Sequence, residues 1–262
     1  VSDFSDLRAR TLSAIGMAVA GFAAIWMGGL VFGLLALVLA GLMGWELHRM
    51  LVPDAPLGRA EATGLVAALM VAVFTWWQSG WVSLAGLALG AAVMAWKMPR
   101  DRVIFGFYLA LILVAAHALI VLRGGFGLAF ILWLVGVVIA SDVAGYFAGR
   151  ILGGPKFWPR VSPKKTWSGT LAGWILAAAV GAGAAVWLGL SWTLVPLSAL
   201  LAFAGQMGDI AESAIKRHAG VKDSSALIPG HGGVLDRFDA LIAVSALALA
   251  LAQVGVFAGL AG

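Results

Sequence analysis

Long apolar stretches follow one another along almost the whole chain, and this pattern limits the folds that the chain can adopt. A helix needs about 17–25 apolar residues to cross the hydrocarbon core of a bilayer, and the stretches repeatedly reach this length. Only 11% of the 262 residues are charged, whereas a soluble domain carries about 25%. The sequence therefore predicts an all-α fold and a polytopic integral membrane protein.

The apolar stretches divide into about nine predicted transmembrane helices. Gly28 and Gly29 alone separate the first two, so we expect a tight helical hairpin there. We expect residues 1–100 to form an N-terminal group of helices and residues 101–262 to form a catalytic region. The nine predicted spans are residues 11–27, 29–45, 62–78, 80–96, 103–122, 126–148, 168–189, 192–211 and 237–258.

Basic residues predict the orientation of these helices, because Lys and Arg concentrate on the cytoplasmic side of a membrane. With nine spans and a cytoplasmic N-terminus, 16 of the 17 basic residues fall in or beside the predicted inside segments, and only Arg123 falls outside. All 12 acidic residues lie in these segments or near the inside ends of spans. We therefore expect a cytoplasm-facing site and an outside C-terminus. The inside segments are residues 1–10, 46–61, 97–102, 149–167 and 212–236.

One group of polar residues lies near the end of the sixth predicted span. Asp142 is an acid inside an otherwise apolar helix, and such a costly placement indicates a functional site. Tyr146 and Arg150 follow at the i+4 and i+8 positions, so they share its helical face. This face is a candidate binding surface at the membrane boundary.

The segment after this span carries two adjacent lysines. We expect the Ser-Pro pair at 162–163 to end regular structure, after which Lys164 and Lys165 precede the next helix. Thr166 or Ser168 can cap that helix, which would bring backbone N–H groups and two cations together as a phosphate site. A basic loop that only touches anionic lipid headgroups explains the same residues. Both interpretations stay open at this point.

A second polar group surrounds the start of the last predicted span. Asp209, Glu212, Ser213 and Lys216 are spaced so that they share one helical face. Asp236 and Asp239 are three residues apart and follow a glycine-rich loop at residues 229–233. Carboxylate oxygens suit Mg²⁺, which keeps several waters and bridges to substrate phosphates. The basic residues that would face a polyphosphate are Lys216, Arg217, Lys222 and Arg237.

Metal ions and cations on phosphate oxygens are the usual apparatus of phosphoryl and nucleotidyl transfer. A helix N-terminus also favours acids and a helix C-terminus favours bases through the dipole alone, so each residue taken singly has a structural explanation. The clustering of six acids among bases at membrane depth favours a functional site. These acids are Asp142, Asp209, Glu212, Asp223, Asp236 and Asp239.

Other features exclude several classes of site. The chain has no cysteine, so disulfides, thiolate metal sites and a cysteine nucleophile are excluded. It has no P-loop motif, and its charge distribution favours a membrane surface over nucleic acid as the partner.

Small residues recur at every fourth position at Gly169, Gly173, Ala177, Gly181 and Ala185. This stripe predicts close helix packing, either within the chain or in a homodimer.

The stretch from residue 213 to 239 resembles the signature of the phosphatidate cytidylyltransferase family. The upstream motifs at 141–150 and 162–169 are similar to this family too. Ser168 stands where the second upstream motif is expected to carry an acid. The signature positions that match are Ser213, Lys216, Arg217, Lys222, Asp223, His231, Gly232, Gly233, Asp236, Arg237 and Asp239.

This resemblance implies a nucleotidyltransferase that condenses CTP with phosphatidic acid to give CDP-diacylglycerol and pyrophosphate, with Mg²⁺. The compact chain suits a bacterial inner membrane. The resemblance implies Asp209 and Asp236 as principal metal ligands, with Asp239 and Asp142 supporting them or holding a second metal ion. The residues expected to hold the triphosphate or the lipid phosphate are Lys216, Lys222, Arg237, Ser162, Lys164, Lys165 and His231. The site is expected to include Tyr146, Thr166, Ser213, Arg217 and Asp223 as well.

Two other readings compete with this one. A CTP-dependent lipid kinase would transfer the terminal phosphate to a polyprenol and release CDP. A cation or phosphate transporter would use the same acids as an ion site, but transporters need polar groups at mid-depth and openings on both sides. His117 is the main ionisable residue at mid-depth, so the sequence favours a one-sided enzyme site.

Overall fold

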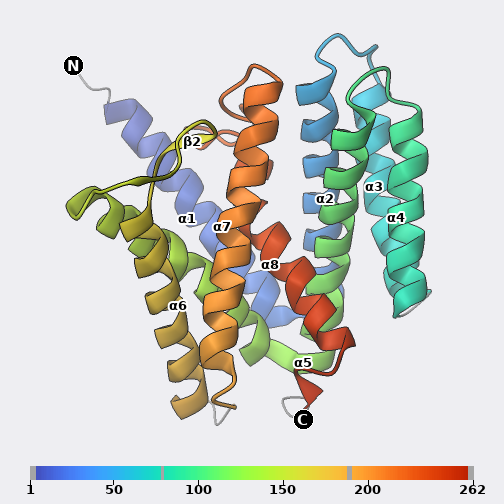
Figure 1. The fold of residues 1–262 in the computed structure, drawn as a ribbon. Coiled ribbons are helices and arrows are strands. Elements are labelled where there is room, and N and C mark those ends of the chain that lie inside the picture. The colour runs from blue at the N-terminus through green and yellow to red at the C-terminus, as the bar shows by residue number, and fades with distance from the viewer. Residues whose placement is uncertain (1–3, 78–79, 188–190, 259–262) are drawn as a thin grey trace. The chain divides into compact units, whose positions relative to one another are not determined.

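The computed structural model describes residues 4–77, 80–187 and 191–258, and this part of the chain is mostly helical (Figure 1). The first hairpin has its turn where the sequence predicts it, because Gly28 and Gly29 both have positive φ angles, 62° and 48°. The helices are α1 (Phe4–Met27), α2 (Gly29–Leu51), α3 (Arg59–Trp76), α4 (Trp81–Trp96), α5 (Arg102–Ile151), α6 (Trp167–Trp187), α7 (Leu194–His218) and α8 (Leu235–Gln253). Two short strands, β1 (Lys156–Trp158) and β2 (Ser162–Thr166), lie between α5 and α6.

The chain forms two compact units. The first unit contains residues 1–121 and 218–238, and the second contains residues 122–217 and 239–262. The chain passes from the first to the second within α5, close to Gly127, whose φ of 79° interrupts the helix. The predicted functional division at residue 100 stays a prediction.

In the first unit, α2 packs against α1 and α3, and α3 packs against α4 (Figure 1). The predicted inside segments of this unit meet one another. Arg100 Nε donates to the carbonyl of Leu51 at 2.8 Å, and His218 Nε2 lies 2.8 Å from Asp101 Oδ1. These contacts join the end of α2, the α4–α5 connection and the end of α7, as a shared membrane face requires.

In the second unit, small residues allow α6 to approach its neighbours. A Cβ added at Gly169 would lie 2.5 Å from the carbonyl oxygen of Gly145 on α5, and one at Gly181 would lie 2.5 Å from that of Leu194 on α7. Only glycine fits such backbone contacts. The predicted small-residue stripe is therefore used within the chain, and the homodimer stays a prediction.

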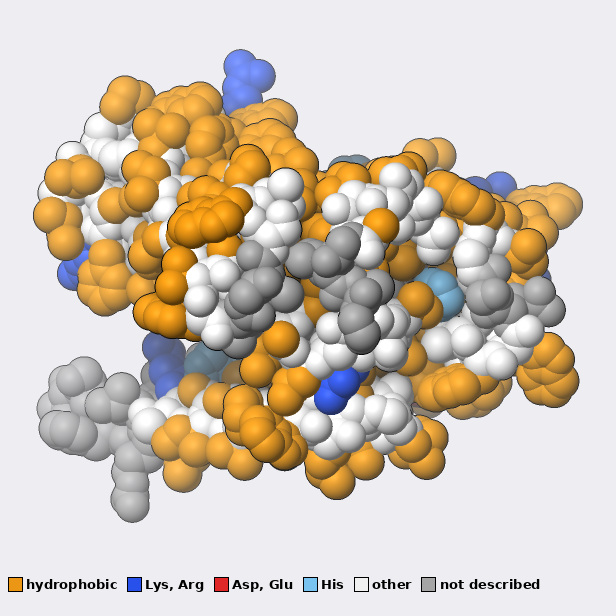
Figure 2. Space-filling view, turned by 90° about the horizontal axis from the view of Figure 1, so that it is seen from below, with side chains coloured by type: hydrophobic (Ala, Val, Ile, Leu, Met, Phe, Trp, Pro, Cys, Tyr) orange, Lys and Arg blue, Asp and Glu red, His pale blue; other side chains and the backbone are white. Residues whose placement is uncertain are grey.

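The surface of the helices suits a bilayer. Figure 2 shows hydrophobic side chains over most of the face it presents, with only a few Lys and Arg among them. Trp77, Val103 and Trp187 are all more than four-fifths exposed, which would be unfavourable in water. The protein is thus an integral membrane protein.

The lengths of the helices bear on the predicted number of spans. Within the described residues, six helices are long and apolar enough to cross a membrane, namely α1, α2, α3, α5, α6 and α7; α4 is apolar but shorter. Two of the nine predicted spans, residues 103–122 and 126–148, fall within α5, and the interruption at Gly127 lies at the start of the second. The last predicted span corresponds to α8, which carries three charged residues, Asp236, Arg237 and Asp239, near its start. The count of nine and the orientation of the termini stay predictions.

One local prediction was wrong. The Ser-Pro pair at 162–163 does not end regular structure, because both residues lie in β2, which pairs antiparallel with β1. Lys156 lies opposite Thr166, and Trp158 lies opposite Ser162. Pro163 is tolerated because a strand of a two-stranded ribbon has an edge that needs no N–H donor.

Candidate functional site

A pocket of about 540 Å³ lies in the second unit, where α5, β2, α6 and α7 meet. It contains many of the residues that the sequence singled out, although they come from separate segments. Its lining residues are Ser141, Asp142, Gly145, Tyr146, Gly149, Arg150, Lys164, Lys165, Thr166, Gly169, Thr170, Gln206 and Asp209. Ser162 is not among them.

Lys165 and Asp209 form the central contact of this pocket. Lys165 Nζ lies 2.5 Å from Asp209 Oδ2 and donates to the Gln206 carbonyl at 3.2 Å. Ser213 donates its hydroxyl to Asp209 Oδ1 at 3.3 Å, one helical turn further along α7. Both members of the ion pair stay partly exposed, with side-chain exposures of 23% and 33%. A phosphate group that enters the pocket would compete with Asp209 for the Lys165 ammonium.

Three carboxylates share this region. Asp142 and Asp209 are close enough to interact electrostatically, and Asp239 interacts with both. The approach of α7 to α8 explains part of this geometry, since a Cβ added at Gly208 would lie 2.6 Å from the Asp239 carbonyl oxygen. Carboxylates are like charges, so their mutual repulsion at short range must be offset by a nearby cation. Lys165 and Lys216 are the cations that interact with this group.

The start of α6 is built as the sequence predicts. Thr166 Oγ1 accepts a hydrogen bond of 3.2 Å from the backbone N–H of Gly169, so Thr166 caps this helix. Ser168 donates its hydroxyl to the Gly153 carbonyl at 2.5 Å. This contact gives a role to Ser168 at the position where the family motif led us to expect an acid. The Gly153 carbonyl accepts a hydrogen bond and so needs a donor, and an ionised carboxylate at position 168 could not donate one.

Gln206 is a part of the pocket that the sequence analysis missed. Its side-chain amide accepts from Trp174 Nε1 at 3.0 Å and donates to Ser141 Oγ and the Thr170 carbonyl, both at 3.3 Å. It thereby joins α5, α6 and α7 behind the Lys165–Asp209 pair. The signal available in the sequence was a lone amide among apolar residues of a predicted span.

The glycine-rich loop and the start of α8 lie in the first unit. Asp236 Oδ2 accepts hydrogen bonds from the backbone N–H and hydroxyl of Ser224, at 2.8 and 2.9 Å, and from the backbone N–H of Gly233 at 2.8 Å. Arg237 Nε donates to the His231 carbonyl at 2.9 Å. Nδ1 of His231 lies 2.8 Å from Ser13 Oγ on α1. Hydrogen bonds therefore hold His231, Gly233, Asp236 and Arg237 of the signature in one loop and helix start.

Glu46 holds this loop from α2, and the sequence analysis did not select it as a site residue. Its carboxylate is fully buried and accepts from the backbone N–H groups of Val234 and Leu235, at 2.9 and 2.7 Å. It also accepts from the hydroxyls of Ser225, at 2.6 Å, and Ser224, at 3.2 Å. A Cβ at Gly233 would lie 2.5 Å from Glu46 Oε1, so glycine is needed there.

The other predicted site residues are placed less centrally. Lys216 pairs with the buried carboxylate of Glu212 one turn away on α7. Lys222 and Asp223 are exposed in the connection between α7 and α8. The predicted site residues are divided between the two units. Those in the first unit are Lys222, Asp223, His231, Asp236 and Arg237. Those in the second unit are Asp142, Tyr146, Ser162, Lys164, Lys165, Thr166, Asp209, Ser213, Lys216, Arg217 and Asp239. In the described part of the chain, no three His, Asp or Glu side chains form a ready-made metal site.

Comparison with known proteins adds an independent observation. Residues 8–254 match the model of the cytidylyltransferase family, which spans both units. The chain belongs to this cytidylyltransferase family. Among the family's curated members, a phosphatidate cytidylyltransferase of Brucella suis is 37% identical over 254 residues, covering 93% of this chain and 92% of the relative. One from Staphylococcus epidermidis is 32% identical over 257 residues, covering 91% of this chain and 96% of the relative.

The match has a consequence for the site. It includes the pocket residues of the second unit and the glycine-rich loop of the first, so the cytidylyltransferase relatives align with both sets of residues. Glu46, Gln206 and Ser168 also lie within the matched range. The residue roles themselves are inferred from the contacts described above.

Proposed function

We propose that this chain is a phosphatidate cytidylyltransferase, which condenses CTP with phosphatidic acid to give CDP-diacylglycerol and pyrophosphate. The observation that carries the proposal is the pocket lined by Arg150, Lys164, Lys165 and Asp209, in which Lys165 pairs with Asp209 at the end of apolar helices. Such a site offers cations for phosphate groups beside a surface that suits acyl chains. The Brucella suis and Staphylococcus epidermidis relatives, which are named for this activity, align over more than nine-tenths of the chain.

The reaction forms one bond and breaks one. A phosphate oxygen of phosphatidic acid attacks the α-phosphorus of CTP, and the bond from that phosphorus to the oxygen bridging to the β-phosphorus breaks. The lipid phosphate is already anionic at neutral pH, so a strong general base is not needed. Alignment of the two phosphates and stabilisation of charge supply most of the rate. Lys164 and Lys165 would grip one phosphate, and Tyr146 and Thr166 would border it.

The remaining cations of the signature are proposed to hold the triphosphate. Lys216, Lys222 and Arg237 would neutralise charge on the departing pyrophosphate, and His231 would position a phosphate oxygen. The loop that presents His231 and Arg237 is fixed by hydrogen bonds to Glu46 and Asp236. A fixed loop places these groups without reorganisation during the reaction.

Mg²⁺ is proposed as the cofactor. The second unit offers Asp209 as a principal ligand, with Asp142 and Asp239 in support, and the first unit offers Asp236. The donor set fits this ion, because carboxylate oxygens are its usual protein ligands. The carboxylates of Asp142, Asp209 and Asp239 repel one another, and a bound cation would reduce this repulsion. When bound, Mg²⁺ would neutralise charge on the triphosphate.

The site is further proposed to face the cytoplasm from a bacterial inner membrane. The support is the concentration of basic residues in the segments that meet at the ends of α2, α4 and α7. Cytoplasmic CTP would reach such a site directly, while phosphatidic acid would enter from the adjoining leaflet.

Labelled CTP tests the reaction type. Purified protein is incubated with phosphatidic acid, Mg²⁺ and CTP labelled either at the α- or at the γ-phosphorus. Cytidylyl transfer puts the α-label into lipid and the γ-label into pyrophosphate. A CTP-dependent lipid kinase would instead put the γ-label into lipid, with a polyprenol as acceptor. Ion flux across liposomes without CTP, and without lipid labelling, would point to a transporter.

A further inference from the structure

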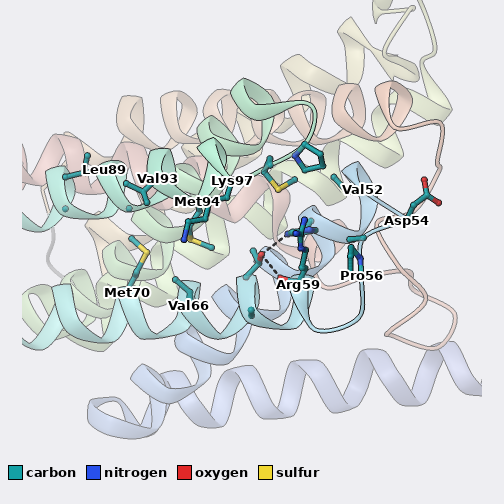
Figure 3. A pocket seen from close by; sticks show the side chains of 18 of the residues that line it. Val52, Asp54, Pro56, Arg59, Val66, Met70, Leu89, Val93, Met94 and Lys97 are labelled. Atoms are coloured by element: carbon teal, nitrogen blue, oxygen red, sulfur yellow. Dashed lines mark hydrogen bonds between the residues drawn. The ribbon is translucent and has the colours of Figure 1, made fainter.

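A long groove runs between α3 and α4 in the first unit (Figure 3). Its volume is about 1160 Å³. Figure 3 shows Val66 and Met70 of α3 facing Leu89 and Val93 of α4 across it. Val66, Leu89 and Val93 are 40%, 67% and 48% exposed, so the groove is open along its length. Its walls can accept an apolar chain.

The groove has cations at one end only. Arg59 is the first residue of α3 and Lys97 follows the last residue of α4, so the antiparallel hairpin brings both to the same end. Both line the groove, and Asp54 is the one acid that does so. Figure 3 shows Asp54 beyond Arg59, away from the apolar walls.

These two cations are available to a ligand. Within the described residues, neither the Arg59 guanidinium nor the Lys97 ammonium has an ion-pair or hydrogen-bond partner. The nearest acid in the sequence, Glu61, accepts instead from Trp45 Nε1 at 3.1 Å and from the Gly58 backbone N–H at 2.9 Å. The polar end of the groove therefore carries positive charge without a partner in the described chain.

The dimensions identify the kind of ligand. From Gly86 to Lys97 the chain rises about 16 Å, at about 1.5 Å per helical residue. One leaflet of a bilayer contributes about half of a hydrocarbon core of about 30 Å, or about 15 Å. The groove therefore matches one acyl chain of a single leaflet, with the cations at the depth of the phosphate.

We propose that this groove binds one anionic membrane phospholipid, with an acyl chain between α3 and α4 and the phosphate between Arg59 and Lys97. None of the lining residues is among those assigned to the reaction. The proposal therefore does not depend on the proposed activity. A free phosphate would meet the two cations but leave the apolar walls uncovered, so a lipid is the better match.

Lipid retention tests the proposal. Full-length protein is purified in detergent, mixed with dioleoyl phosphatidylglycerol or dioleoyl phosphatidylcholine, and the retained lipid is measured by native mass spectrometry. Phosphatidylglycerol is used because it is anionic but is not the proposed substrate. The Arg59→Gln/Lys97→Gln double variant should bind it about tenfold more weakly, since each cation near a headgroup contributes to anionic-lipid binding. Phosphatidylcholine retention should not change.

A matched control removes the same charge elsewhere. The Lys156→Gln/Arg160→Gln double variant, on the β1–β2 ribbon of the second unit, should retain phosphatidylglycerol as the parent does. A separate variant, Val66→Trp, fills the groove at an exposed position and should lower retention while both cations remain. The proposed activity should stay within about twofold of the parent in all three variants, because none alters the pocket of the second unit.

Several results would overturn the proposal. Equal retention of both lipids by the parent would make the groove an ordinary lipid-facing surface. Unchanged phosphatidylglycerol retention in the Arg59→Gln/Lys97→Gln variant would exclude the cations as its anchor. Competition by glycerol 3-phosphate as strong as that by phosphatidylglycerol would show a free-anion site instead of a lipid site.

Discussion

The buried carboxylate of Glu46 on α2 accepts a 2.7 Å hydrogen bond from the backbone N–H of Leu235, the first residue of α8. An acid of the first helical hairpin thus fixes the start of the helix that carries Asp236 and Asp239. A buried carboxylate is costly unless hydrogen bonds satisfy it. The donors that satisfy Glu46 all belong to the loop and helix start that contain the family signature.

Replacing this acid should loosen the loop. In Glu46→Gln, one acceptor oxygen becomes an NH₂ group that faces donors, so we expect a loss of about 2 kcal/mol. For a chain of this size that corresponds to a fall in Tm of about 4–8 °C. Thermal unfolding followed by tryptophan fluorescence in detergent measures it. Asp54→Asn, at an exposed acid, is the matched control and should shift Tm much less; equal shifts would refute a special role for Glu46.

Ser168 supplies a second prediction, because its hydroxyl donates to the Gly153 carbonyl. Ser168→Ala should cost about 1 kcal/mol through the lost hydrogen bond. Ser168→Asp should cost more, since an ionised carboxylate would face a carbonyl oxygen. The same unfolding assay ranks the two variants, and an Asp variant as stable as the parent would contradict the assigned contact.

The close approach of α7 to α8 gives a third prediction. Gly208→Ala would place a methyl group 2.6 Å from the Asp239 carbonyl oxygen, and relieving such an overlap typically costs about 1–3 kcal/mol. Activity should fall too, because Asp209 and Asp239 would move apart. Gly136→Ala is the control, since its nearest neighbour, Val180, would be at an ordinary 3.5 Å. Equal effects of the two substitutions would show that the contact is not tight.

The Lys165–Asp209 pair distinguishes a structural from a functional role. If the pair only holds α7 against β2, either single substitution should impair folding and, with it, the rate of CDP-diacylglycerol formation. Exchanging the charges in Lys165→Asp/Asp209→Lys should then restore both folding and the rate. If the pair serves the reaction, the exchange should restore folding but leave the rate of CDP-diacylglycerol formation at least about 100-fold below the parent. Recovery of most of the rate by the double variant would contradict the functional assignment.

Several elements could be predicted from the sequence because their causes are local. The turn at Gly28 and Gly29 follows from two glycines between apolar runs, and the Thr166 cap follows from a hydroxyl at the start of a helix. Asp142 could be selected because an acid in an apolar span is rare. In each case the signal lies within a few residues of the feature.

Other elements depend on contacts that are distant along the chain. Glu46 and Ser224 are 178 positions apart, and nothing local to Glu46 indicates its partners. Lys165 reaches Asp209 because a β-ribbon carries it, and the sequence analysis expected irregular structure there. Gln206 likewise acts by joining three helices that only the fold brings together.

The central claim, cytidylyl transfer at the Lys165–Asp209 pocket, is tested most directly by the initial rate of CDP-diacylglycerol formation. The rate is measured with saturating phosphatidic acid, CTP and Mg²⁺ for the parent, Asp209→Asn, Asp236→Asn and the exposed-site control Arg160→Gln. The parent and Arg160→Gln should form the product at similar rates, and both Asp→Asn variants should lose at least about 100-fold. A folded parent that forms no CDP-diacylglycerol, or an Asp209→Asn variant as active as the parent, would contradict the account.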